Sequence, residues 1–184
     1  MQRDVVERAQ RGDHDAFATL AAACLGRLDT AARLVLRDPD RAKDAVQETL
    51  MRAWRDLPGL RDPDRFDAWL HRLLVRSCYD ELRKNRRRPV EVELTEIGMS
   101  HPTDEARSFD ERDELERGFR RLDADQRLVV VLHYYLDLPL PEVASMLGVP
   151  VGTAKSRLHR ALAVLRRTIG AQRETARLAE EVAR

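Results

Sequence analysis

Cysteine and long apolar runs are scarce in this sequence. Its two cysteines, Cys24 and Cys78, cannot form the disulfide framework of a small secreted domain. No apolar run approaches the length of a membrane span, and the opening MQRDVVERAQ lacks the apolar core of a signal peptide. These absences argue against a disulfide-rich secreted protein and an integral membrane protein. We therefore expect a cytoplasmic protein with no membrane span.

The usual signatures of catalytic and metal centres are also missing. Cys and His do not occur at metal-ligand spacing, and neither a glycine-rich phosphate loop nor a nucleophile elbow is present. We predict that the protein is not an enzyme, has no catalytic residues and binds neither a metal nor a cofactor. The two cysteines are expected to act as buried, small hydrophobic residues.

Glycine, proline and aromatic residues are few, whereas charged residues are abundant. Ala, Arg, Leu, Glu and Asp dominate the composition, which favours helix throughout. Hydrophobic residues form 43% of the chain, enough to build a core, and charged residues form 35%, above the usual quarter. We predict an all-α protein.

The net charge is only +1, but basic and acidic residues are concentrated in different segments of the chain. Residues 143–173 contain no Asp or Glu, and five of the six residues 83–88 are basic. The distribution of charge says more about partners than the sum does. These two segments are the candidate nucleic-acid contacts.

The N-terminal half contains three segments with apolar residues at helical steps of three and four. The breaks between them, RDPD and PGLRDPD, have the composition of turns, and Pro39 is well placed to open a helix. Three such stripes can cover one another, so residues 1–88 are predicted to form a helical bundle domain. The predicted helices are 13–36, 40–57 and about 64–88.

Composition changes abruptly at Pro89. Residues 89–107 hold five acids, have no Lys or Arg before Arg107 and show no sustained period, so we predict an acidic linker. Capping patterns at Ser108-x-x-Glu111 and Asp123-x-x-Gln126 then predict that helices resume.

A second helical domain is predicted over residues 108–170. The run LVVVLHYYL at 128–136 has the composition of a buried strand, but its cap and its helical neighbours favour helix. Residues 171–184 show some helical spacing and are treated as a frayed tail with no assigned role.

Two helices joined by a tight, glycine-containing turn predict a helix-turn-helix motif in the second domain. Gly148 can supply the left-handed backbone that ends the first helix, and the second starts three residues later. Early-turn residues of such a second helix reach base edges in the major groove, and long cations neutralise phosphates. The candidates are Thr153, Lys155, Ser156, Arg157, His159 and Arg160.

The second basic cluster ends the helix predicted at 64–88. Five adjacent like charges repel one another unless a partner offsets them. Trp69 and Phe66 on the same helix could stack on unpaired bases, but Trp69 falls on the apolar stripe and is better explained as core. The candidate phosphate contacts are Arg83, Lys84, Arg86 and Arg87. The alternative for both clusters is a solvated basic face with no ligand.

Three segments resemble signature segments of the extracytoplasmic-function sigma factors, the small two-domain promoter-specificity subunits of bacterial RNA polymerase. They are DPDRAKDAVQETLMRAW, RFDAWLHRLLVRSCYDELRKNRRRP and LPLPEVASMLGVPVGTAKSRLHRAL. The similarity spans roughly residues 13 to 168, in the order that the family shows.

The resemblance implies a role for each segment. The helix at 40–57 would dock on core RNA polymerase through Asp44, Gln47, Glu48 and Met51, which form a second stripe away from the core. The alternative is a plain polar face with pairs such as Glu48 with Arg52, worth ~0.2–0.5 kcal/mol each. The acidic linker would thread through the polymerase cleft, or it is ordinary disorder.

The resemblance also implies contacts with promoter DNA. The helix at 64–88 would read and hold open the minus-ten element, with Arg76 standing where the family commonly has Asn. The recognition helix would bind the minus-thirty-five element, with Lys155, Ser156, His159 and Arg160 facing bases and with Thr153 and Arg157 at phosphates. An anti-sigma protein is the expected regulator.

Two other functions remain open from the sequence. A stand-alone helix-turn-helix regulator would bind duplex DNA, usually as a symmetric dimer. A helical adaptor with incidental basic patches would show no dependence on DNA.

Overall fold

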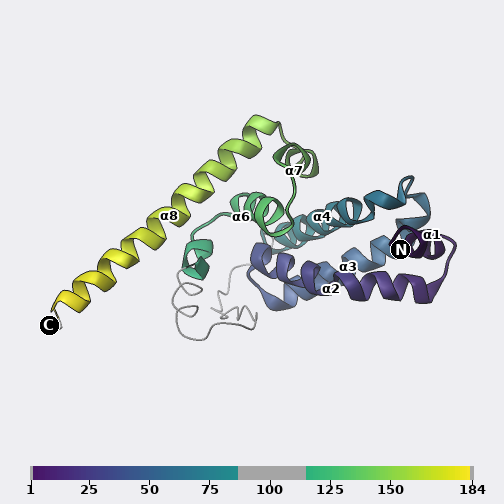
Figure 1. Ribbon diagram of the computed structural model, residues 1–184, viewed down its shortest axis with the longest axis horizontal. Coiled ribbons are helices and arrows are strands. Elements are labelled where there is room, and N and C mark those ends of the chain that lie inside the picture. Colours follow the sequence, from purple (N-terminus) through teal and green to yellow (C-terminus); the bar gives the residue numbers. More distant parts are fainter. Residues whose placement is uncertain (1, 87–114, 183–184) are drawn as a thin grey trace. The chain divides into compact units, whose positions relative to one another are not determined.

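The computed structural model describes residues 2–86 and 115–182, and within these ranges every regular element is helical (Figure 1). The chain divides into two compact units, residues 1–97 and 98–184. Side chains are described for residues 3–84 and 115–168. The prediction of an all-α fold is confirmed. The predicted linker at 89–107, the Ser108–Glu111 cap and Arg87 lie outside the described residues.

The first unit begins with a helix that the sequence analysis did not predict, α1 (Gln2–Gln10). It buries Val6 and Ala9, and the side-chain amide of Gln10 donates to the carbonyl oxygens of Leu57 and Leu60 at 3.2 and 2.7 Å. These hydrogen bonds attach α1 to the turn that precedes the last helix of the unit.

The three predicted helices of this unit are present as α2 (His14–Leu36), α3 (Pro39–Asp56) and α4 (Phe66–Arg86). Two short 3₁₀ turns, η1 (Leu57–Gly59) and η2 (Pro63–Arg65), connect α3 to α4. Asp38 caps α3 by accepting a 3.0 Å hydrogen bond from the backbone N–H of Arg41, with Pro39 in the first turn. Pro39 therefore opens the helix as predicted.

Helices α2, α3 and α4 pack against one another to make the core of the first unit. Small residues such as Ala42, Ala45 and Ala53 on α3 are almost fully buried, which lets the helices approach closely. Trp69 is only half-buried, although its ring lies 6.0 Å from the ring of Phe66. Leu28 on α2 and Leu70 and Cys78 on α4 are among the fully buried side chains of this core.

The second unit is built around α6 (Ala124–Val130), which continues into a π-helical turn, η3 (Val131–Tyr135). Asp123 and Gln126 form the predicted capping box, in which each side chain bonds the other residue's backbone N–H. Residues 128–132 are all buried, so this helix is covered on every side. The prediction of helix rather than strand for the run at 128–136 is confirmed.

Two further helices complete the second unit, α7 (Leu140–Leu147) and α8 (Val151–Val182). Both contact the α6–η3 segment, and residues 115–120 are also helical. α8 runs without a break past residue 170 to Val182, so the backbone of the predicted tail continues the recognition helix rather than fraying from it.

Candidate nucleic-acid interface

The turn between α7 and α8 has the geometry of a helix-turn-helix. α7 ends at Gly148, whose backbone is left-handed with φ 66°, and the N–H of Val149 donates to the carbonyl of Ala144 at 3.0 Å. α8 begins at Val151, and its first turn is closed by the N–H of Ala154 on the carbonyl of Pro150 at 3.1 Å. The predicted motif therefore occupies the predicted residues.

Most of the predicted DNA contacts on α8 face solvent. Lys155, Ser156, His159 and Arg160 are exposed, whereas Ala154 and Leu158 on the opposite side of the helix are buried. Arg160 folds along the helix, because its Nε donates to the carbonyl of Ser156 at 3.2 Å. This outward face offers hydrogen-bond donors and acceptors, the groups that read base edges, and it carries no acid.

Arg157 and Thr153 differ from these four, because both are only partly exposed. The guanidinium of Arg157 lies 2.8 Å from a carboxylate oxygen of Asp125 in the first turn of α6. The sequence analysis did not predict this ion pair. Arg157 is thus paired with another residue of the protein, and it lies at the edge of the outward face of α8 rather than at its centre.

The basic end of α4 is partly neutralised by the protein itself. Arg76 and Arg83 are exposed, and so is Lys84, but the Lys84 ammonium lies 2.6 Å from the carboxylate of Glu81. That hydrogen bond raises the pKa of Lys84. Arg86 ends α4 without a described side chain.

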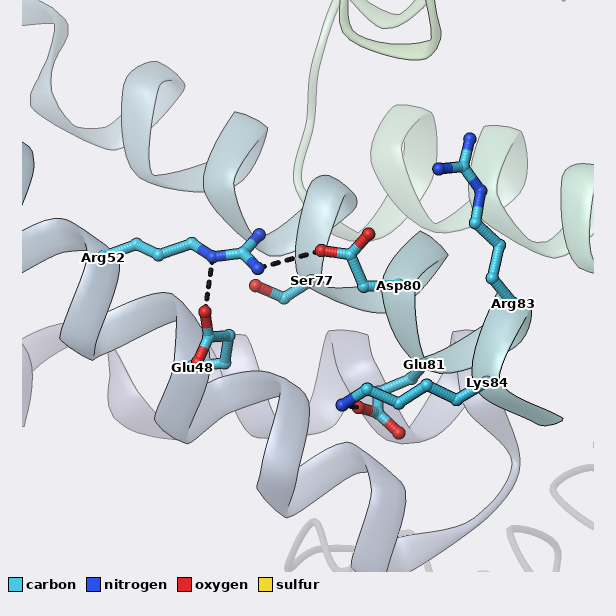
Figure 2. Close-up of a pocket in the computed structure, with 7 residues that line it drawn as sticks. All are labelled: Glu48, Arg52, Ser77, Asp80, Glu81, Arg83 and Lys84. Carbon is cyan, nitrogen blue, oxygen red and sulfur yellow. Dashed lines mark hydrogen bonds and ion pairs between the residues drawn. The ribbon is translucent and has the colours of Figure 1, made fainter.

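A cleft of about 410 Å³ is lined by residues of α3 and of the C-terminal half of α4 (Figure 2). Across it, Arg52 on α3 binds the carboxylates of Glu48 at 2.6 Å and Asp80 at 2.9 Å, and so joins the two helices. The side chain of Arg83 points away from this cluster (Figure 2). The remaining lining residues are Ser77, Glu81 and Lys84.

The predicted docking residues on α3 fall into two groups. Asp44 and Gln47 are exposed, and Met51 is 62% exposed, which is unusual for a large apolar side chain. Glu48 is half-buried and is held by Arg52. The exposed Met51 and its polar neighbours make the surface that a partner helix could cover.

The buried side chains of His71 and Cys78 both lie in α4. Burial, reinforced by the charge of Arg27, lowers the pKa of His71 to about 4, and burial raises the pKa of the Cys78 thiol to about 12. Burial also raises the pKa of Cys24, which is half-buried. The prediction that the cysteines are buried is confirmed for Cys78, whereas Cys24 is only half-buried.

Among the described residues, no group of three or more His, Cys, Asp and Glu side chains is arranged to hold a metal ion. Within the same part of the chain, none of the helices combines the length and the apolar character required to cross a membrane.

Two family models match the chain, one in each unit. The model described as Sigma-70 region 2 matches residues 20–88, and the model described as Sigma-70, region 4 matches residues 112–165. The first match runs from within α2 to the end of α4, and the second includes the helix-turn-helix and the exposed residues Lys155, Ser156, His159 and Arg160 of α8.

Several curated proteins are similar over most of their length. The ECF RNA polymerase sigma factor SigM of Mycobacterium tuberculosis is 33% identical over 160 residues, which cover 86% of this chain and 80% of that protein. The ECF RNA polymerase sigma factor SigW of Bacillus subtilis is 27% identical over 177 residues, covering 89% of this chain and 94% of that protein.

Two solved structures share the arrangement of helices. CnrH, in complex with the cytosolic domain of CnrY, matches with a TM-score of 0.66 and 28% identity over 92% of this chain and 97% of that one. RpoE of Bartonella quintana, in complex with the anti-sigma factor NepR, matches with a TM-score of 0.68 and 25% identity over 84% of this chain and 96% of that one.

Proposed function

Since this chain belongs to the ECF sigma factors of RNA polymerase, which direct promoter-specific initiation of transcription, we propose how its residues divide that function. The observation that carries the proposal is the order of the two matches, region 2 over residues 20–88 and region 4 over 112–165. Each match contains exposed cations, Arg83 and Lys84 in the first and Lys155 and Arg160 in the second. We propose that the chain has no catalytic activity of its own and acts in the cytoplasm, beside the polymerase.

The outward face of α8 reads the minus-thirty-five element in this proposal. Lys155, Ser156, His159 and Arg160 supply the base contacts, because they are exposed on the early turns that enter the major groove. Thr153 lies at the flank of this face and is assigned to a phosphate. Arg157 is left out of both sets, because its guanidinium pairs with Asp125.

The exposed side of α4 holds the minus-ten element. Arg76 lies nearest the middle of the helix and is assigned to the opened bases, whereas the cations at its C-terminal end are assigned to phosphates. Lys84 contributes less than a free cation would, because Glu81 already neutralises part of its charge. The phosphate set is Arg83, Lys84, Arg86 and Arg87.

Core polymerase docks on the outer face of α3. Met51 is the centre of this surface, because a largely exposed apolar side chain gains most from being covered. Asp44, Gln47 and Glu48 supply polar contacts around it, although Glu48 must share its carboxylate with Arg52.

We also propose that an anti-sigma protein regulates the chain. Support comes from the two similar structures, CnrH with CnrY and RpoE with NepR, each solved as a complex with a second protein. Such a partner would act by covering the polymerase or promoter surfaces.

Transcription with purified components tests the proposal. The chain is mixed with core RNA polymerase and promoter DNA from its own source, and transcript starts are mapped. We expect specific starts only when both proteins are present. Tight operator binding without polymerase, and no change in start sites with it, would favour a stand-alone regulator instead.

The docking surface is tested with Gln47→Ala combined with Met51→Ala, which leaves the Glu48–Arg52 pair intact. We expect loss of polymerase binding with an unchanged melting temperature. Leu25→Ala is the matched control, because Leu25 is also an exposed apolar residue, 46% exposed on α2. Equal losses from the two variants would show that α3 is not the specific docking surface.

A further inference from the structure

The polar residues of α8 lie at different angles from its buried face. Successive residues of an α-helix turn by about 100°, so positions three and four apart share a side. Arg157 is three residues after Ala154 and four before Ala161, both of which are fully buried. Ser156, His159 and Arg160 lie farther round the helix and are exposed. Arg157 therefore borders the packed face, and the other three face outward.

The partner of Arg157 lies on the helix beneath it. Asp125 is in the first turn of α6, where the helix dipole favours a carboxylate, and its oxygen is 2.8 Å from the Arg157 guanidinium. The Arg157 side chain is only 22% exposed and the Asp125 side chain is 41% exposed. A phosphate contact would require Arg157 to turn away from this acid.

We propose that Arg157 is a positioning residue. Its ion pair with Asp125 fixes the rotation of α8 on α6 and so orients the outward face of α8 toward the bases. This inference rests on the proposed reading of the minus-thirty-five element by α8. It replaces the phosphate contact that the sequence predicted for Arg157.

The buried face of α8 combines small and large apolar side chains. Ala154 and Ala161 are fully buried, and Leu158 and Leu165 are each 7% exposed. Apolar contacts are not directional, whereas a functional site needs its groups held to within ~10–20°. The ion pair at one edge of this face adds a directional restraint.

Replacement of Asp125 distinguishes a positioning role of Arg157 from a phosphate contact. Asp125→Asn removes a negative charge close to DNA, so simple electrostatics predicts equal or tighter binding. Positioning predicts the opposite, a loss of promoter selectivity of about two- to fivefold, as expected for a partly exposed pair. The readout is binding of the reconstituted holoenzyme to a promoter, compared with the same promoter carrying a scrambled minus-thirty-five element.

Three further variants complete the test: Arg157→Gln, the double variant Asp125→Asn with Arg157→Gln, and Lys155→Gln as the matched exposed cation on the same helix. If the pair acts as a unit, the double variant binds no more weakly than either single one. Lys155→Gln lowers the slope of log affinity against log salt, because it removes an exposed cation beside the DNA, whereas Arg157→Gln leaves the slope unchanged.

Several outcomes would overturn the positioning role. They are Asp125→Asn binding as well as or better than the wild type, Arg157→Gln lowering the salt slope, or additive losses in the double variant. Circular-dichroism melts check that each variant is folded, and loss of selectivity in an unfolded variant counts against positioning. A wild-type holoenzyme with no promoter selectivity would overturn the proposed function itself, whereas a selective wild type with an unimpaired Asp125→Asn variant overturns this inference alone.

Discussion

The carboxylate of Asp80 on α4 lies 2.9 Å from the guanidinium of Arg52 on α3, although the two residues are 28 positions apart (Figure 2). The same guanidinium binds Glu48 at 2.6 Å and is only 18% exposed. Burial lowers the pKa of Arg52, but its hydrogen bonds to Asp80 and Glu48 outweigh burial, and the net pKa is raised. Helices α3 and α4 are therefore joined by charge as well as by apolar packing.

Asp80→Asn should destabilise the first unit by about 1–2 kcal/mol, because it leaves the half-covered charge of Arg52 with one carboxylate instead of two. Urea denaturation measures the loss. Asp56→Asn is the control, since its partner Arg55 is 70% exposed and the pair joins adjacent residues. We expect no measurable change in the control, and a similar loss in both variants would refute a specific role for the α3–α4 bridge.

The buried His71 should make stability depend on pH. Its folded pKa, about 4, lies below the ordinary value of 6.5, so between these values the unfolded chain takes up a proton that the folded chain does not. Stability is therefore full above about pH 6.5 and falls as the pH drops towards 4, by up to about 1.4 kcal/mol per pH unit.

His71→Leu removes that proton uptake, and the difference between wild type and variant isolates it from carboxylate titration. We expect the unfolding free energy of the variant to decline less steeply between pH 6.5 and 4. Parallel profiles for the two proteins across this window would show that His71 is not the group responsible.

Arg160→Ala tests the base contacts assigned to α8. If Arg160 binds a base through both of its terminal nitrogens, the substitution should cost about 1–3 kcal/mol at one position of the minus-thirty-five element and relax the preference there. Holoenzyme binding to single-base variants of the element measures this. Arg166→Ala, an exposed cation farther along α8, should leave every preference intact. An unchanged preference in Arg160→Ala would remove Arg160 from the base-reading set.

Gly148→Ala should destabilise the second unit by about 1 kcal/mol, because φ is 66° there and L-residues adopt that conformation at a cost. The added methyl group would meet nothing within 4 Å, so any loss reports backbone strain alone. Gly152→Ala is the control, since that glycine lies inside α8 and its Cβ would also have open space. The control should be neutral or stabilising, and equal losses at both sites would contradict the argument from φ.

Local signals in the sequence predicted local structure well. The capping box of Asp123 and Gln126, the start of α3 at Pro39 and the left-handed Gly148 each depend on neighbours within a few residues. α1 was missed, because it is short and buries only Val6 and Ala9 fully, too few positions to define a stripe.

The ion pairs of the candidate sites could not be predicted, because they join residues from different helices. Asp80 follows Arg52 by 28 positions, and nothing in the sequence selects it from the other acids of α4. Arg157 was assigned to phosphate because it stands in a polar row. Its spacing from Ala154 and Ala161 was the available signal that it borders the packed face.

The packing of α8 on α6 defines the smallest piece of this protein that can be transplanted. A hybrid factor that exchanged only α7 and α8 would separate Arg157 from Asp125. It would also place Leu165 against a foreign helix. In this chain Leu165 packs so closely on Gly118 that an added Cβ there would lie 2.7 Å from the leucine. If α8 reads the minus-thirty-five element as proposed, the choice of that element depends on residues 115–165 as a unit, and engineering it requires moving them together.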